Sequence, residues 1–149
     1  MTIYQKTQYG YFIIAFSLII SILIGFSHYY QLSEKPLPLT ASILLIGFLM
    51  LSMLTFYKLT IHINQEKITA TFGLGIIKKT MLLSEIDKNS IEKVSMPWYV
   101  GIGIRITPKG TLYNVKIGDS IFINNKQQTK TFLVGTDDFE GIKTALDKL

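Results

Sequence analysis

Two long uncharged segments constrain the fold of this chain more than any other feature. Residues 7–33 contain no Asp, Glu, Lys or Arg, and residues 36–57 contain none either. Each segment includes an apolar run of about 20 residues, enough for a helix to cross about 30 Å of hydrocarbon. The runs at 11–30 and 39–57 are therefore predicted to be transmembrane helices. A cleaved signal peptide is the alternative for the first run, but the run is too long and no small-residue cleavage site follows it.

The connector between the two runs predicts a hairpin. Pro36 and Pro38 interrupt any helix there, so residues 1–57 are assigned to a two-helix transmembrane hairpin. Residues 58–149 carry 13 Lys or Arg against 9 Asp or Glu, whereas the two charges of the connector cancel. The positive-inside rule then places both termini in the cytoplasm of a multi-pass cell-membrane protein. The chain has no cysteine, which fits a reducing compartment and excludes disulfides.

The basic residues of the second part are spread along the chain rather than clustered in one stripe. A modest, dispersed excess of this kind favours an anionic membrane surface as a partner. Nucleic-acid binding needs a concentrated basic patch, so no nucleic-acid partner is predicted.

Beyond the second run the apolar pattern changes from helical to alternating. In "LTIHIN" and "KITATF" the apolar residues alternate with polar ones, which predicts two half-buried strands joined by the turn "NQEK". Further strands are predicted near residues 76–83, 91–96, 102–107, 112–115, 119–125 and 130–135. The last segment, 137–149, places Phe139, Ile142 and Leu146 on one helical face after the capping residue Asp137. Residues 58–149 are therefore predicted to form a mostly β domain that ends in an amphipathic helix.

The stretch "WYVGIGIRITPKG" mixes glycines with basic residues, as phosphate-binding loops do. In such a loop the glycines follow a strand and open a helix, whose N-terminal amides meet the anion. Here Ile102, Ile104 and Ile106 alternate with Arg105 along a strand, and "TPKG" forms the turn after it. The isoleucines are predicted on one face and Arg105 on the other, so this stretch is a strand rather than a phosphate loop.

Two stretches, "GIGIRITPKGTLYNV" and "FLVGTDDFEGIKTAL", together with this order of elements, resemble small bacterial membrane proteins that carry a pleckstrin-homology-like domain after a transmembrane hairpin. The resemblance implies a strongly bent antiparallel β barrel of about seven strands, with the C-terminal helix plugging one end. It also implies a domain that binds lipids or proteins, or acts as a scaffold, and is not an enzyme. The turn "NQEK" lacks the several Lys or Arg of a phosphoinositide clamp, so that specific function is not transferred.

Residues that carry catalysis or metal binding are scarce. His28 and His62 have no nearby carboxylate at a recognisable spacing, so no catalytic residue, metal or cofactor is predicted. Asp137 and Asp138 are adjacent, but their place before a helix predicts capping rather than acid–base chemistry.

Contact with lipid or with a partner is predicted for the loop that holds Trp98 and Tyr99, the most aromatic loop outside the helices. Arg105 lies close enough in sequence to meet phosphates beside it. The alternatives are that Trp98 fills the core and that Arg105 is a solvated surface residue.

Helix packing is predicted for Ser17, Ser21 and Gly25, which recur every four residues in the first helix. Small residues on one face let helices approach closely, and Gly47 is the candidate contact on the second helix. The alternative is association between copies of the chain, which leaves a homo-oligomer open.

These observations predict a non-enzymatic, membrane-anchored protein whose β domain binds a protein partner or the bilayer surface as a scaffold. The alternative is an accessory subunit that regulates a membrane transporter or enzyme complex. A stoichiometric membrane partner in a detergent pull-down distinguishes the second function from the first.

Overall fold

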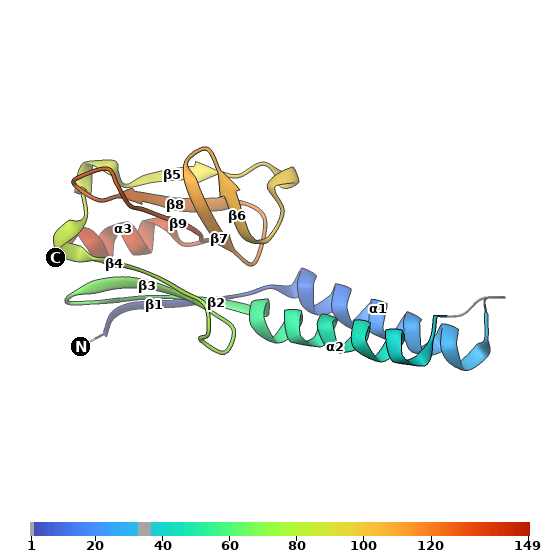
Figure 1. The fold of residues 1–149 in the computed structure, drawn as a ribbon. Helices are drawn as coiled ribbons and strands as arrows, with labels where there is room; N and C mark the ends of the chain where they lie inside the picture. Colours follow the sequence, from blue (N-terminus) through green and yellow to red (C-terminus); the bar gives the residue numbers. More distant parts are fainter. Residues whose placement is uncertain (1, 33–36) are drawn as a thin grey trace.

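The computed structural model describes residues 2–32 and 37–149, and shows a β-rich domain at one end of a long helical hairpin (Figure 1). The hairpin consists of α1 (Tyr11–Tyr30) and α2 (Leu39–Phe56). Both ends of the chain lie in the β domain, at the end of the molecule away from the tip of the hairpin (Figure 1). The predicted order of two apolar helices, a β domain and a terminal helix is confirmed. Of the connector prolines, Pro38 is the N-cap of α2, and Pro36 lies outside the described residues.

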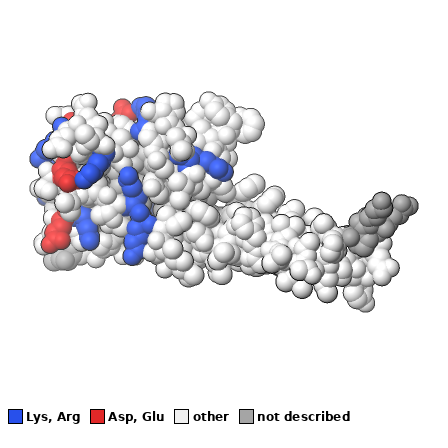
Figure 2. All heavy atoms as spheres, viewed as in Figure 1, with Lys and Arg blue, Asp and Glu red and all other residues white. Residues whose placement is uncertain are grey.

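Both helices are long and apolar enough to cross a membrane. Their outward side chains, such as Phe12, Ile22 and Leu44, are exposed, so most of the hairpin surface has no protein cover. An apolar surface of this extent is what lipid covers in a membrane protein. In Figure 2 the visible charged side chains gather on the β domain, and the hairpin shows none.

The residues before α1 form a strand that the sequence analysis did not predict. β1 (Thr2–Tyr9) pairs antiparallel with β2 (Lys58–Asn64), from Thr2 opposite Asn64 to Tyr9 opposite Lys58. These residues therefore belong to a sheet of the β domain, although residues 1–57 had been assigned to the hairpin. The sequence of β1 has no alternation of apolar and polar residues that would predict a strand, because its one buried side chain is the polar Gln8.

Nine strands in the described residues form two sheets. The first has the order β1-β2-β3-β4, with β3 (Lys67–Phe72) and β4 (Lys78–Leu82). The second has the order β5-β8-β9-β7-β6. Its members are β5 (Glu92–Ser95), β6 (Gly103–Thr107), β7 (Gly110–Asn114), β8 (Asp119–Asn124) and β9 (Thr131–Gly135). Short 3-10 turns occupy Leu83–Glu85, Lys88–Ser90 and Trp98–Val100.

The predicted antiparallel barrel is wrong in two respects. The described strands form two separate sheets rather than a closed barrel, and β7 pairs in parallel with β9, where Leu112 lies opposite Leu133. The cause lies in β9, in which Phe132, Leu133 and Val134 are all buried. A strand that is apolar on both faces belongs at the centre of a sheet, so β9 inserts between β8 and β7.

The C-terminal helix α3 (Phe139–Asp147) lies between the two sheets (Figure 1). Its Ile142, Ala145 and Leu146 are buried in one core with residues of both sheets, including Ile61 and Ile121. The predicted amphipathic helix is thus confirmed, and it begins two residues later than 137. The helix joins the sheets through their inner faces and does not plug the end of a barrel.

The hairpin is joined to the β domain without a linker. Phe56, the last residue of α2, packs edge-on against Phe72 of β3 with ring centroids 5.1 Å apart. Phe72 in turn lies 6.1 Å from the ring of Tyr113 in β7. Gly73 has φ +45°, and a Cβ there would lie 2.4 Å from two carbonyl oxygens in the last turn of α2. Glycine therefore allows the β3–β4 turn to pack against the helix end, which fixes the domain relative to the hairpin.

Candidate membrane-facing site at the hairpin base

Exposed apolar side chains of the β domain gather around the base of the hairpin. The β3–β4 turn, which packs against the end of α2, exposes Leu74 and Ile76. The β7–β8 turn exposes Ile117, two residues beyond Val115. The carbonyl oxygen of Val115 lies beside Gly10, at the start of α1. Apolar side chains therefore flank the hairpin from both sheets.

The connection between β5 and β6 adds two aromatic rings. Trp98 is 78% exposed and Tyr99 74% exposed, and their rings meet edge to face 6.3 Å apart. The alternative that Trp98 fills the core is therefore wrong. In Figure 1 this yellow-orange connection projects toward the side of the domain that carries the hairpin. Met96 and Val100, on either side of the pair, pack into a small core cluster that holds the connection in place.

Strand β6 also exposes apolar side chains. Of the predicted row of isoleucines, Ile102 precedes the strand, whereas Ile104 and Ile106 lie on β6, an edge strand of its sheet. Ile104 is partly exposed and Ile106 is 94% exposed. We refer to the exposed apolar residues of these segments together as the apolar rim; its members are Leu74, Ile76, Trp98, Tyr99, Ile104, Ile106 and Ile117.

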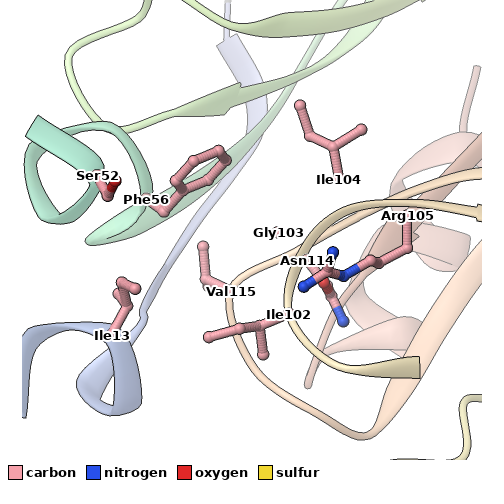
Figure 3. Close-up of a pocket in the computed structure, with 9 residues that line it drawn as sticks. All are labelled: Ile13, Ser52, Phe56, Ile102, Gly103, Ile104, Arg105, Asn114 and Val115. Carbon is pink, nitrogen blue, oxygen red and sulfur yellow. The ribbon is translucent and has the colours of Figure 1, made fainter. Parts of the chain in front are cut away.

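A cleft of about 310 Å³ opens between the rim and the helix ends (Figure 3). Its walls come from α1, α2, the start of β6 and the end of β7, and the lining side chains are mostly apolar. The lining residues are Ile13, Ser52, Phe56, Ile102, Gly103, Ile104, Arg105, Asn114 and Val115. These residues lie up to about 100 positions apart in the sequence, so only the tertiary fold brings them together.

Two polar side chains of this cleft meet at Gly101. A Cβ on Gly101 would lie 3.6 Å from Nε of Arg105, so the guanidinium rests against the open side of this glycine. Asn114 is only 2% exposed, and its Nδ2 donates to the carbonyl oxygens of Gly101 and Lys116, at 3.0 and 3.2 Å. These two bonds fix the orientation of the amide, and its buried Oδ1 has no hydrogen-bond partner among residues 2–32 and 37–149.

Charge distribution distinguishes Arg105 from several lysines nearby. Lys109 pairs with Glu92, and Lys93 pairs with Asp119 at 2.7 Å. Lys116 donates to Asp137 Oδ2 at 2.7 Å, and this hydrogen bond lowers the pKa of the Asp137 carboxyl. Arg105 has no ion pair within residues 2–32 and 37–149. Its charge is therefore free to meet an anion.

The structure separates the four residues predicted for helix packing. Ser17 is buried between the helices, and Ser21 has a buried hydroxyl on the same side of α1. Gly25 and Gly47 lie on outer surfaces, where an added Cβ would meet no atom within 4 Å. On α2 the buried small residue is Ser42 instead. Serine rather than glycine lines the contact between α1 and α2.

Metal-ligating side chains do not cluster in the described part of the chain. No group of three or more His, Asp or Glu side chains there is placed to hold a metal ion. His62 shares a hydrogen bond with Thr2, across β1 and β2. The predicted capping role falls to Asp138, whose Oδ1 accepts from Gly141 N, whereas Asp137 pairs with Lys116.

Comparison of the chain with protein-family models, with curated proteins and with solved structures finds no match. Sequence reasoning reached Trp98, Tyr99 and Arg105 but not Ile13, Phe56 or Asn114. Those three come from different elements, and no local pattern marks them as neighbours.

Proposed function

We propose that this chain is a membrane-anchored, non-enzymatic scaffold whose β domain rests on the bilayer surface through the apolar rim. The observation that carries the proposal is the position of the rim: Leu74 and Ile76 lie in the turn that packs against the end of α2, and the connection with Trp98 and Tyr99 projects to the same side of the domain (Figure 1). Trp and Tyr prefer the headgroup region because each has an apolar body and a polar tip. The hairpin sets the distance from the bilayer, and the rim supplies the contact.

The side of the membrane follows from charge. Lys6 of β1 and Lys58 of β2 flank the hairpin where it enters the β domain, and most of the remaining basic residues follow in the same domain. The positive-inside rule favours the cytoplasm for this end. We therefore propose a cytoplasmic β domain with both termini in the cytoplasm.

The pleckstrin-homology-like character of the β domain belongs to this proposal as well. Two sheets and a C-terminal helix are compatible with it, and the parallel pairing of β7 and β9 is a departure from the antiparallel pattern that the resemblance implies. A domain of this kind supports a binding role, because sheets with a terminal helix provide rigid edges and loops for partners.

Fluorescence of Trp98, the only tryptophan, tests the proposal. The full chain is reconstituted in vesicles that contain lipids brominated near the carbonyl end of the acyl chains. We expect strong quenching of Trp98 emission, since bromine quenches only at close range. Unchanged emission would refute contact with the bilayer. Unchanged emission together with a stoichiometric membrane protein in a detergent pull-down would favour the accessory-subunit function instead.

A further inference from the structure

The cleft at the hairpin base has the composition of a site for one phospholipid. We propose that it holds the phosphate and glycerol region of a membrane glycerophospholipid, with Arg105 on the phosphate. This inference rests on the proposed function, because it needs the β domain to lie at the bilayer surface. It goes further by naming a ligand class and a place.

The depth of the cleft along the hairpin matches the position of a lipid headgroup. Phe56 is the last residue of α2, and Ile13 is the third residue of α1. At 1.5 Å per residue, these side chains lie within about 5 Å of the helix ends. If the two helices span the hydrocarbon core, the cleft lies at the boundary between acyl chains and headgroups, which is where a lipid carries its phosphate and glycerol.

The cleft also separates apolar from charged side chains. Ile13, Phe56 and Val115 line it on the hairpin side, and Arg105 lies on the β-domain side (Figure 3). An amphipathic lipid has the same division, with apolar chains toward the bilayer and an anionic phosphate above them. A guanidinium presents a planar pair of N–H donors that matches two phosphate oxygens.

The charge of Arg105 also lacks a partner in the described residues. Arg105 makes no ion pair with any described acidic residue, whereas Lys93, Lys109 and Lys116 each do. Asn114, which also lines the cleft, is a neutral side chain, and its amide donates to two backbone carbonyls, so it does not neutralise Arg105. The phosphate of a glycerophospholipid supplies the anion that would pair with Arg105.

The volume limits what enters. About 310 Å³ is at the lower end of small-molecule sites, which span about 300–1,000 Å³. The cleft therefore accommodates a phosphate and glycerol backbone, while the acyl chains continue along the hairpin surface. Ile14, Met53, Leu54 and Tyr57 line a shallow apolar groove at the same end of the hairpin, which would receive the upper part of a chain.

Lipid retention measured by native mass spectrometry tests the proposal. The full chain in detergent is titrated with phosphatidylglycerol, with diacylglycerol, which lacks the phosphate, and with soluble glycerol 3-phosphate. We expect one phosphatidylglycerol to be retained about tenfold more tightly than diacylglycerol, the size of a charge-assisted hydrogen bond. Equal retention of diacylglycerol would overturn the phosphate site. Displacement of the lipid by glycerol 3-phosphate at equal concentration would overturn the assignment to a lipid.

Substitution locates the site. Arg105→Gln is expected to lose the tenfold preference, while Lys143→Gln, the same change of charge on the exposed side of α3, should retain it. Retention of the preference in Arg105→Gln would overturn the proposed role of this residue. The comparison of the two lipids on the unmodified chain holds even if a variant folds poorly. Quenching of Trp98 by brominated lipid, with no preference for phosphatidylglycerol, would reject this site and leave the surface contact intact.

Discussion

Tyr4 ties the unexpected first strand to the last helix, and its removal tests that connection. Its hydroxyl donates to Asp138 Oδ2 at 2.8 Å, across 134 positions of sequence. Asp138 uses its other oxygen to cap α3 through Gly141 N at 3.1 Å. The substitution Tyr4→Phe removes one hydroxyl and leaves the ring in the core.

The expected loss of stability follows from the strength of a hydrogen bond to a charged carboxylate. A hydrogen bond to a charged group contributes about 1.5–3 kcal/mol, and partial exposure of this pair favours the lower end of that range. A loss of 1 kcal/mol lowers the melting temperature of a domain of about 100 residues by about 4 °C or more. We therefore expect Tyr4→Phe to lower the melting temperature of the β domain by about 6 °C or more. The measurement is thermal unfolding in detergent, followed by circular dichroism, with hydrogen exchange of α3.

The pH dependence of stability provides a second test of this hydrogen bond. Burial, followed by the hydrogen bond to Asp138, raises the pKa of the Tyr4 phenol above its ordinary value of about 10. A group whose pKa is raised in the folded state stabilises fully below its unfolded pKa and loses that contribution as the pH rises. The difference between the native chain and Tyr4→Phe should therefore be constant up to about pH 10 and shrink above it.

Tyr99→Phe is the matched control, because Tyr99 is exposed and makes no hydrogen bond through its hydroxyl in the described structure. We expect it to leave the melting temperature unchanged. Equal stability of Tyr4→Phe and Tyr99→Phe would mean that the bond from Tyr4 to Asp138 does not stabilise the fold, and that β1 does not support α3 through it.

Three further predictions concern backbone, charge and topology. Gly73→Ala should destabilise the fold by more than about 2 kcal/mol in thermal melts, because positive φ and the carbonyls of α2 both oppose a Cβ; Gly75→Ala, which has positive φ but no contact below 3.7 Å, should cost less. Asp137→Asn should cost at most about 1 kcal/mol at pH 7, since its ion pair is exposed. Because the pKa of Asp137 is lowered in the fold, this cost should disappear in melts as the pH falls below about 4, whereas a constant cost would contradict the ion pair. Single cysteines at Ser33 and Gln127, probed in intact cells with a membrane-impermeant thiol reagent, should show labelling at Ser33 only; labelling at Gln127 would place the β domain outside.

The sequence predicted those elements whose signals are local. An uncharged run of about 20 residues predicts a long apolar helix, and the alternation of Leu59, Ile61 and Ile63 predicts a strand with one buried face. The amphipathic pattern of Ile142 and Leu146 did the same for the terminal helix. These signals need no knowledge of neighbours, and the structure has each of these elements.

The sequence did not predict features that depend on distant partners. β1 is polar, and it becomes a strand because its backbone pairs with β2, which no pattern of side chains records. The apolar residues of β9 favour a central place in a sheet, but they do not specify β8 and β7 as its neighbours. The cleft joins Ile13 to Asn114 only through both of these arrangements, so its members had no common signal in the sequence.

Spin labels measure directly whether the apolar rim lies at the bilayer surface. The chain has no native cysteine, so single cysteines at Ile76, Tyr99 and Lys143 carry one label each. In vesicles, labels at Ile76 and Tyr99 should relax more with lipid-soluble oxygen than with a water-soluble nickel complex. The label at Lys143, on the exposed side of α3, should show the reverse. Greater nickel access at Ile76 and Tyr99, equal to that at Lys143, would contradict the account and place the rim in water.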